Sequence, residues 1–322
     1  MKFHAYPLEF EPILTHNIWG GDQLKKQLNK AATSDKTGES WEISAVEGSV
    51  SKVRNGEYST LSLTEILQKF PEEILGTNVF AKFGSKFPLL FKFIDAHQDL
   101  SIQVHPSDEV AMKRHHTLGK TEMWYIMHAE PDAKITIGFK DDSSPEAYVK
   151  HLEDKTLFDI LNQDSVSEGD VYFLKTGTVH SIGKGILLAE IQQTSDITYR
   201  IYDFDRVDDN GKGRQLHVEE ALDVIDYFPA DSKRNYEKTT NEINSVVECP
   251  YFTTNFIKVD GEMDFDKLDT SFRVYMCVEG SVDIVADNNV YKYKKGDTVL
   301  IPAALKDFSL RGNASLLEIY IS

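Results

Sequence analysis

The sequence predicts an all-β protein built from two small, related barrels, with short helical insertions in and around the first. Most of its 322 residues fall into short runs of alternating apolar and polar side chains, the pattern of half-buried strands. One unit occurs twice: residues 168–177 and 295–304 share a Gly-Asp pair followed by an apolar strand and a turn. A repeated strand-and-turn unit is typical of barrels that are built alike. We therefore expect two domains, at residues 1–235 and 236–322.

Strands and helices are expected to alternate along the first domain. Period-two alternation predicts strands at residues 38–44, 88–94, 103–105, 122–126, 133–139, 186–192 and 198–203. Helical segments are expected at residues 61–75, 106–119, 144 to about 162, and 217–228. Thr64 is a candidate cap of the first helix and Ser143 or Ser144 of the third, whose first turn contains Pro145. Residues 231–244 are expected to be a linker, followed by short strands with Gly and Asn turns.

The composition restricts the class of protein. Hydrophobic residues make up 41% of the chain, enough for a core, and no apolar run approaches the roughly 18 residues of a membrane-spanning helix. The first residues contain no apolar segment of the kind found in secretory signals. A net charge of −17 argues against nucleic acid and anionic membranes as partners, whereas a local cluster of cations can still bind an anionic small molecule. Cys249 and Cys277 lack metal-type spacing and fit a reducing cytoplasm.

A candidate metal site is spread over three segments. Gln103 and His105 are two residues apart in an alternating run, so on a strand both side chains leave the same face. Glu122 opens a later strand, and His180 follows the first Gly-Asp strand and its turn. Two imidazoles, a carboxylate and an amide oxygen are the mixed donors of a divalent metal ion, zinc most often. We expect one ion per chain.

The remaining histidines have a simpler interpretation. They lack a partner at ligand spacing, and we expect surface or packed residues. In the second copy of the Gly-Asp unit, Leu305 and Asp307 stand near the place of the histidine, and no histidine follows His217. The second barrel is therefore expected to hold no metal.

The four candidate ligands match the two-part pattern of the cupin superfamily. The chain departs from that pattern in three respects: Gln103 stands where most cupins have histidine, Lys175 replaces a turn proline, and the gap before Glu122 is enlarged. Four strings, FPLLFKFI at 87–94, LSIQVHP at 100–106, GKTEMW at 119–124 and EIQQTSDITYR at 190–200, resemble the type I mannose-6-phosphate isomerases in a short form. The resemblance covers most of residues 10–206 and is diffuse after about residue 235.

This resemblance implies two cupin barrels of the double-stranded β-helix type and a specific activity. The activity is the interconversion of mannose 6-phosphate and fructose 6-phosphate, by metal-assisted proton transfer through an enediol or enediolate. The family's zinc ligands fall on the four residues named above, and its catalytic arginine falls on Arg200. Lys120 and Glu190 match candidates for the group that moves the proton, and the sequence does not choose between them.

Lys92, Ser101 and Arg206 are expected to hold the sugar phosphate. Lys92 lies mid-strand among apolar residues; if both faces of that strand are covered, its ammonium group needs an anion or a cavity. A lysine on a solvated edge strand is the alternative. Ser101 shares its strand face with Gln103. The resemblance places Lys92 and Ser101 at the phosphate, and Arg206 is added as a nearby cation.

Two other classes of protein remain open: a metal-dependent cupin oxygenase and a sugar-binding cupin without turnover. The glutamine ligand and the motif around Arg200 argue against the first, and the presence of Arg200 with all four ligands argues against the second. The sequence does not define the native metal, the range of sugar phosphates accepted, or whether the protein is a monomer or a dimer.

Overall fold

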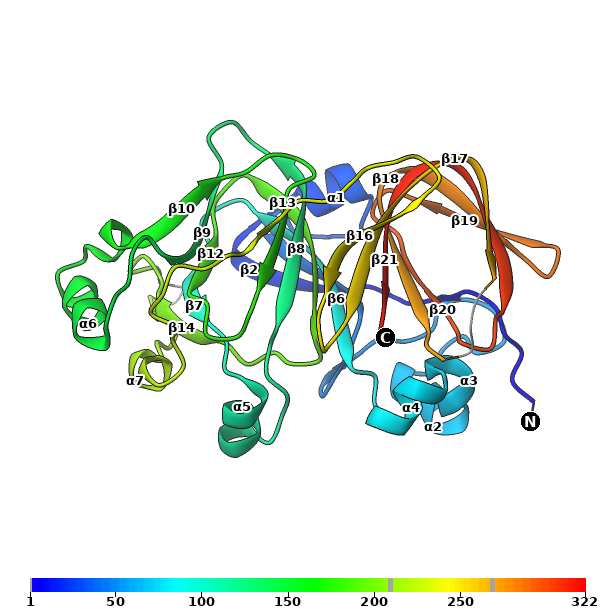
Figure 1. Ribbon diagram of the computed structural model, residues 1–322, viewed down its shortest axis with the longest axis horizontal. Coiled ribbons are helices and arrows are strands. Elements are labelled where there is room, and N and C mark those ends of the chain that lie inside the picture. Colours follow the sequence, from blue (N-terminus) through cyan, green and yellow to red (C-terminus); the bar gives the residue numbers. More distant parts are fainter. Residues whose placement is uncertain (1, 208–210, 267–269) are drawn as a thin grey trace.

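The fold is mostly β, with antiparallel sheets. A computed structural model describes residues 2–207, 211–266 and 270–322. Figure 1 shows two β-rich halves side by side, one running from blue to green and the other from yellow to red. Among the described residues, no helix is both long enough and apolar enough to cross a membrane.

The middle layer of the molecule, here called the central sheet, belongs to the N-terminal half. In spatial order its strands are β15 (Lys233–Arg234), β11 (Val171–Leu174), β8 (Glu122–Ala129), β13 (Ile186–Gln193), β6 (Leu89–Ala96), β3 (Thr37–Ile43) and β2 (Ile13–Gly21). Every residue of β6 and β13 is buried. This burial explains their near-continuous apolar runs, since a strand covered on both faces has no solvated side. The short strand β15 also lies within the segment that was expected to be a linker.

A second layer, here called the outer sheet, completes this half. Its spatial order is β10 (Leu161–Ser165), β9 (Lys134–Phe139), β12 (His180–Ile182), β7 (Ile102–Val104) and β14 (Tyr199–Tyr202). The strands expected at 103–105, 133–139 and 198–203 are confirmed within two residues. Residues 161 and 162, expected at the end of a helix, instead begin β10, because pairing with β9 draws them into the sheet.

The C-terminal sheet forms the other half. Its spatial order is β1 (Leu8–Glu9), β20 (Thr298–Ile301), β18 (Arg273–Ala286), β21 (Asp307–Tyr320), β17 (Thr253–Asp266) and β16 (Ile243–Glu248), with β19 (Asn289–Lys294) paired to β18. The expectation of short strands is wrong for β17, β18 and β21, each of which has 14 residues. Gly261, Gly280 and Gly312 have positive φ inside these strands. Such glycines bend a continuous strand, so these three positions are bends rather than the expected turns, whereas Asn288 and Gly296 do lie in turns between strands.

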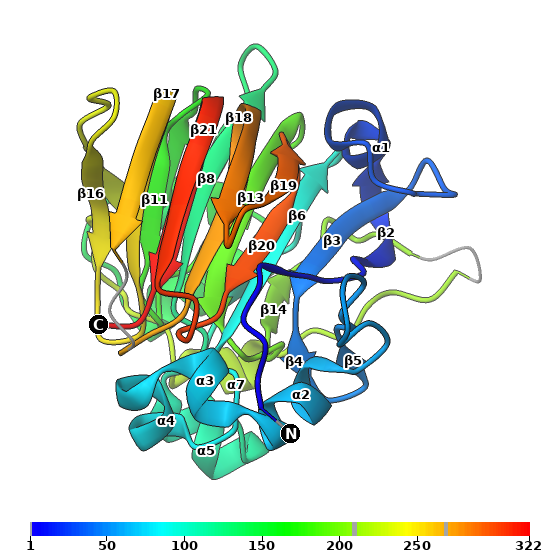
Figure 2. The same cartoon turned by 90° about the vertical axis from the view of Figure 1, so that its right-hand side faces the viewer.

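Both faces of the central sheet are covered by apolar side chains. On one face Ile94, Trp124 and Leu188 share a core with Ile135 and Ile182 of the outer sheet. On the other face a larger core joins the central sheet to the C-terminal sheet, and it includes Phe91, Met123, Ala189, Phe256 and Leu317. Figure 2 shows this stacking, with β17, β21 and β18 in front of β11, β8 and β13. The central sheet is thus the inner layer of three.

The helices are shorter than the sequence predicted. They are α1 (Gln23–Leu28), α2 (Leu63–Lys69), α3 (Pro71–Leu75), α4 (Thr77–Phe83), α5 (Asp108–His115), α6 (Pro145–Glu153), the 3-10 turn η1 (Leu157–Asp159) and α7 (Val218–Leu222). A separate small hairpin pairs β4 (Ala45–Val46) with β5 (Ser49–Val50). The helix expected at 61–75 is divided, because Pro71 cannot continue α2 and opens α3 instead. Its cap is Ser62 rather than Thr64: the Ser62 hydroxyl accepts from the Glu65 N–H, and the Glu65 carboxylate accepts from the Ser62 N–H.

The two later helices begin near the predicted positions but end early. Ser144 caps α6 and Pro145 lies in its first turn, as predicted, yet the helix ends at Glu153. The helix expected at 217–228 is limited to the single turn of α7.

The repeated Gly-Asp unit folds into the same turn in both halves. Gly169 and Gly296 have φ of 84° and 92°, a region that favours glycine. In each copy the aspartate that follows the glycine accepts a hydrogen bond from the backbone N–H three residues before it. Asp170 accepts from Ser167 and Asp297 accepts from Lys294, both at 2.9 Å. The turn then leads into β11 in the first copy and β20 in the second. The internal repeat predicted from the sequence is therefore structural.

Gly296→Ala is expected to destabilise the fold more than the control Gly261→Ala. Both glycines have φ of 92°, so each substitution places a Cβ in left-handed backbone, at a cost of about 1–2 kcal/mol. Only at Gly296 would that Cβ also clash, 2.7 Å from Leu28 Cβ of α1, whereas nothing lies within 4 Å at Gly261. Overpacking adds roughly 1–3 kcal/mol. Urea unfolding measures the difference, and equal stabilities of the two variants would contradict this contact between the halves.

Candidate metal centre and substrate cavity

A cavity of about 180 Å³ is walled by the central and outer sheets. Its lining includes six residues predicted for the site, Lys92, Ser101, Gln103, Lys120, Glu190 and Arg200. It also includes polar and aromatic residues that were not anticipated from the sequence: Asn17, Trp19, Glu39, Trp41, Asp196, Thr198 and Arg214. A larger hollow of about 390 Å³, lined by residues such as Glu130 and Lys184, contains none of the predicted residues. The smaller cavity is therefore the candidate site.

Strand register brings the central-sheet residues of the cavity into one row. Glu190 on β13 is directly opposite Lys92 on β6 and Trp124 on β8, and Lys92 is opposite Trp41 on β3. Residues that are opposite in antiparallel strands share a face of the sheet. Trp124 belongs to the core between the two sheets of this half, so the whole row faces the outer sheet.

The outer sheet supplies a second row. Gln103 on β7 is directly opposite His180 on β12 and Arg200 on β14. Gln103, a proposed metal ligand, thus lies between the proposed ligand His180 and the candidate catalytic residue Arg200. The pairing joins positions about a hundred residues apart, so it could not be predicted from local alternation.

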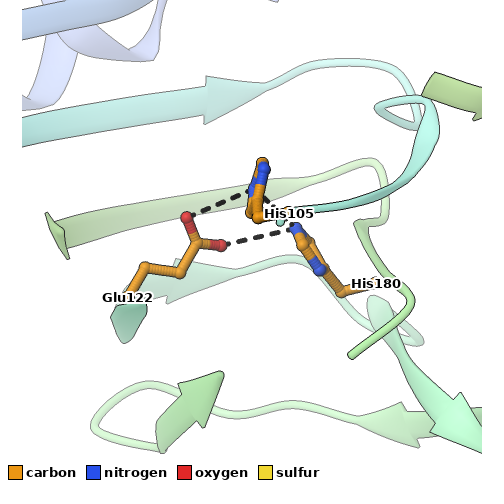
Figure 3. Close-up of side chains that lie close together, drawn as sticks. All are labelled: His105, Glu122 and His180. Atoms are coloured by element: carbon orange, nitrogen blue, oxygen red, sulfur yellow. Dashed lines mark hydrogen bonds and ion pairs between the residues drawn. The ribbon is translucent and has the colours of Figure 1, made fainter. Parts of the chain in front are cut away.

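His105, Glu122 and His180 converge (Figure 3), with one ligand atom from each within 4.8 Å of the others. They adjoin the cavity through Gln103 and Lys120, two of its lining residues, which lie 3.2 Å from His180 Nε2 and His105 Nε2. The two histidine Nε2 atoms are 3.2 Å apart. Glu122 Oε1 lies 3.4 Å from His180 Nε2, and Oε2 lies 3.6 Å from His105 Nε2. The Gln103 amide group is 3.2 Å from His180 Nε2. Within residues 2–207, 211–266 and 270–322, no other three His, Cys, Asp or Glu side chains gather in this way.

Backbone carbonyls orient both imidazoles. His105 Nδ1 is 2.9 Å from the Ile197 carbonyl oxygen, and His180 Nδ1 is 2.8 Å from that of Thr178. Because a carbonyl only accepts hydrogen bonds, Nδ1 carries the proton in each ring and Nε2 presents a lone pair. Burial lowers the pKa of His105 well below its usual value and that of His180 to about 4. Both rings are therefore neutral at pH 7.

This donor set fits a divalent metal ion. Two lone pairs 3.2 Å apart lie beside the Glu122 carboxylate, whose Oε2 meets the Lys120 ammonium group whereas its buried Oε1 has no hydrogen-bond donor. Such a buried group is unfavourable unless a cation compensates it. Lys120 Nζ approaches Glu122 Oε2 to 2.8 Å as an ion pair, but one ammonium group does not satisfy all the ligand atoms. Neutral imidazoles with carboxylate and amide oxygens suit a metal site that keeps an open position.

Buried charges surround the ligand cluster. Glu190 Oε1 lies 3.3 Å from Lys92 Nζ and 3.9 Å from Lys120 Nζ, and Trp124 Nε1 donates to Glu190 Oε2 at 2.9 Å. Burial raises the pKa of Glu190, but the two lysines and Trp124 outweigh it, so the pKa is lowered and the group is ionised at pH 7. Burial opposes the ammonium form of Lys120, but Glu122 and Glu190 outweigh it and raise the pKa to about 12. Burial, and after it Glu190, raises the pKa of Glu122.

The predicted phosphate contacts differ in their surroundings. Ser101 accepts a hydrogen bond from Arg200 Nε at 3.3 Å on the cavity wall. Lys92 also lines the cavity, with Glu39 Oε1 3.9 Å away and the Trp41 ring centroid 4.7 Å away. The burial of Lys92 confirms that its strand is covered on both faces rather than at a solvated edge.

Arg206 lies outside the cavity lining. Its guanidinium group donates to the backbone and carboxylate oxygens of Asp203 and to the carbonyl of Asp99. Arg214 lines the cavity instead, although no sequence signal distinguished it, since it lies in an irregular segment between β14 and α7.

A polar residue at the end of β13 fixes the segment that carries Lys120 and Glu122. Gln193 Oε1 accepts from the Thr121 N–H at 2.9 Å, and Gln193 Nε2 donates to Asp108 Oδ1 at 2.9 Å. Asp108 Oδ1 also accepts from the Gly119 N–H at 2.7 Å. The start of β8 is thereby tied both to α5 and to the neighbouring strand.

Comparisons with known proteins agree with this geometry. Residues 8–137 match the family model of the phosphomannose isomerase type I catalytic domain, and residues 242–321 match that of the mannose-6-phosphate isomerase cupin domain. The mannose-6-phosphate isomerase ManA of Bacillus subtilis is 36% identical over 316 residues, which cover 97% of this chain and 98% of the relative. The mannose-6-phosphate isomerase of Streptococcus mutans is 34% identical over 316 residues, with the same coverage.

Solved structures show the same fold. The mannose 6-phosphate isomerase from Bacillus subtilis matches with a TM-score of 0.90 at 32% sequence identity, covering 99% of this chain and 100% of that one. A putative mannosephosphate isomerase from Archaeoglobus fulgidus matches with a TM-score of 0.80 at 23% identity, covering 100% and 99%, a likeness that supports the fold alone.

Antiparallel sheets with two histidines and a glutamate gathered in a buried cluster define a cupin-type protein with a site able to hold a metal ion. The matches extend over nearly the whole length of the relatives as well as of this chain. The chain belongs to the type I phosphomannose isomerase family. It is therefore an enzyme, of the isomerase class.

His180→Ala is expected to abolish the binding of a divalent metal ion, because it removes one of the two imidazoles in the ligand cluster. The matched control is His128→Ala, a partly buried histidine of β8 outside the cluster, which should bind metal as the unsubstituted protein does. Elemental analysis after zinc loading and dialysis measures the bound metal, and the melting temperature reports folding. Stoichiometric metal in a folded His180→Ala protein would contradict the ligand assignment.

Proposed function

We propose that this chain interconverts mannose 6-phosphate and fructose 6-phosphate by proton transfer between C1 and C2, assisted by one zinc ion per chain. The observation that carries the proposal is a cluster of metal-type ligands that adjoins a cavity lined by a buried carboxylate, Glu190, and by Arg200. Aldose–ketose exchange needs a Lewis acid, a group that moves the proton, and a cation near the oxygens on which negative charge develops.

Gln103, His105, Glu122 and His180 are the proposed zinc ligands. A mixed nitrogen and oxygen set with neutral imidazoles supports zinc over harder cations, which prefer oxygen ligands alone. When bound there, the ion would polarise the substrate carbonyl and favour negative charge on its oxygen. The chain's own contribution is rigidity: the carbonyls of Thr178 and Ile197 hold both rings with Nε2 directed at the same point.

Glu190 is the proposed base. Its Oε2 is held by Trp124, whereas its buried Oε1 meets only the ammonium groups of Lys92 and Lys120, at 3.3 and 3.9 Å, and belongs to a residue that lines the cavity. In the open-chain aldose, Glu190 would take the proton from C2 and return it to C1 while a second proton passes between the two oxygens. The C1 aldehyde becomes an alcohol as the C2 alcohol becomes a ketone, so no external oxidant is needed. The two carboxylates of Glu122 and Glu190 keep Lys120 as an ammonium ion, which would act on the substrate as a proton donor or as a nearby positive charge.

Arg200 is the proposed cation for the enediolate. It lies directly opposite Gln103, so it reaches the cavity beside a metal ligand. Its guanidinium is held from two sides, with Nε donating to Ser101 Oγ and Nη1 to the Gln215 carbonyl at 3.0 Å. A guanidinium group that is planar, permanently charged and held in this way can donate hydrogen bonds to two substrate oxygens at once, which a lysine ammonium group cannot do in the same geometry.

Lys92, Ser101 and Arg206 are the phosphate contacts expected from the sequence. The geometry supports Ser101 best, because its hydroxyl is on the cavity wall and in contact with Arg200. The Lys92 ammonium is already paired with Glu190, and the Arg206 guanidinium with Asp203.

We also propose that the sheets form two cupin barrels, a metal-binding one within residues 1–235 and a metal-free, structural one within 236–322. The repeated Gly-Asp turn, the cupin-domain match at 242–321 and the lack of any histidine after His217 in the sequence support this division. A cytoplasmic location is proposed as well, in keeping with the free thiols of Cys249 and Cys277.

A coupled assay for fructose 6-phosphate tests the function. The zinc-loaded protein is expected to form it from mannose 6-phosphate, to lose activity with a chelator, and to regain it with added zinc. Full activity in protein shown by elemental analysis to be metal-free would contradict the metal-assisted mechanism. Sugar phosphate binding without turnover would favour a non-catalytic cupin, and oxygen consumption would favour an oxygenase.

Arg200→Lys is expected to keep the fold and the metal but to lose kcat, on the order of a hundredfold or more, as is typical when one transition-state donor is removed. The matched control is Arg311→Lys, an exposed arginine paired with Glu262 in the C-terminal sheet, for which kcat should not change. Steady-state kinetics separate the alternatives. A rise in KM with kcat preserved would make Arg200 a phosphate anchor. A lower melting temperature with unchanged kinetics would make it a structural residue.

A further inference from the structure

Two arginines bind one buried carboxylate beside the cavity, and a third lines the cavity with one of them. Asp203, only 5% exposed, accepts hydrogen bonds from Arg214 Nε at 2.8 Å and from Nη2 of both Arg206 and Arg214 at 2.5 Å. Arg200 lines the cavity together with Arg214, and its Nη1 donates to the carbonyl of Gln215, the residue after Arg214, at 3.0 Å. Three guanidinium charges and the Asp203 carboxylate therefore lie in this part of the molecule, and their sum is positive. Such an arrangement at a cavity wall favours an anionic ligand.

The two arginines that contact Asp203 face different surroundings. Arg206 uses all three guanidinium nitrogens on oxygens of Asp203 and Asp99, its guanidinium carbon lies 5.1 Å from the Phe204 ring centroid, and it does not line the cavity. Arg214 directs Nε and Nη2 to Asp203, and its side chain forms part of the cavity wall. An anion in the cavity therefore meets Arg214 rather than Arg206.

The contacts along the wall have an order that gives a direction to a bound sugar phosphate. Gln103 of the ligand cluster is directly opposite Arg200, and Arg200 Nη1 donates to the carbonyl of Gln215, the residue after Arg214, at 3.0 Å. In this series of contacts Arg200 lies between the ligand cluster and Arg214. A hexose 6-phosphate has the reacting C1 and C2 at one end and the phosphate at the other. With C1 and C2 at the ligand cluster, the phosphate reaches the end occupied by Arg214.

We propose that Arg214 binds the substrate phosphate, and that Asp203 is a positioning residue that holds the Arg214 guanidinium at the cavity wall. This inference rests on the proposed function and identifies the contact that selects phosphorylated over free sugars. The planar guanidinium group suits a phosphate because two parallel N–H groups can meet two of its oxygens. Asp203 fixes the plane of the group and retains Arg206 as a second partner.

Arg214→Gln is expected to raise the KM for mannose 6-phosphate on the order of 10- to 100-fold, as for other hydrogen bonds to charged groups, with kcat nearly unchanged. Competitive inhibition by inorganic phosphate should weaken by the same factor. Metal content and melting temperature should stay close to those of the unsubstituted protein, because Asp203 keeps its pair with Arg206. Arg311→Gln, the matched exposed arginine, should leave KM and phosphate inhibition unchanged.

Asp203→Asn tests the positioning role with a side chain of the same shape. It should raise KM and weaken phosphate inhibition while kcat holds, whereas a merely structural carboxylate would lower the melting temperature and leave both constants unchanged in the folded protein.

Three results would overturn the inference: an Arg214→Gln protein with unchanged KM and phosphate inhibition, a loss confined to kcat, or a larger rise in KM for Arg206→Gln than for Arg214→Gln. Failure of the unsubstituted protein to form fructose 6-phosphate would overturn the proposed function instead. In that case calorimetric binding of inorganic phosphate, compared between the unsubstituted protein and Arg214→Gln, still decides the role of Arg214.

Discussion

Ionisable groups buried in and beside a sheet that is covered on both faces are the physical constraint on which this site depends. Lys92, Lys120, Glu122 and Glu190 are each at most 5% exposed. Removing such groups from water is costly unless each finds an opposite charge or a hydrogen bond. Their positions are therefore coupled: the two lysines meet Glu190, and Lys120 also meets Glu122. A change at any one of them removes a partner from at least one other buried group.

The C-terminal half takes part in this constraint although its described residues contribute nothing to the cavity lining. Its side chains Phe256, Val274 and Leu317 cover the face of the central sheet that points away from the site. Without that cover, β6 and β13 would expose apolar side chains to water. The water-free environment that strengthens the charge pairs on the site face therefore depends on packing on the opposite face. This gives the C-terminal half a physical reason to be present.

Local pattern was enough to predict that His105, Glu122 and His180 belong to one site, and to predict part of the fold. Period-two alternation determines that Gln103 and His105 leave one face of a strand, whatever the strand pairs with, and both take part in the site. Glycine and aspartate at the repeated turn also act locally, through a positive φ and a carboxylate that accepts a neighbouring N–H. These features survive in the fold because they do not depend on distant residues.

What could not be predicted depends on pairing between distant segments. The placement of Arg200 opposite Gln103, and of Glu190 opposite Lys92, is set by strand register. The helix expected to reach residue 162 ends early because pairing with β9 competes with local helical spacing. Arg214 has no local signal, since its place is fixed only by Asp203.

Anomalous X-ray scattering at the zinc absorption edge, from crystals of the zinc-loaded enzyme, tests the central claim most directly. The account predicts one peak per chain, at about 2.0–2.1 Å from Nε2 of both His105 and His180 and at about 2.0–2.2 Å from a Glu122 oxygen. A fully active crystal form with no peak among these three side chains, or with its zinc held by other residues, would contradict it.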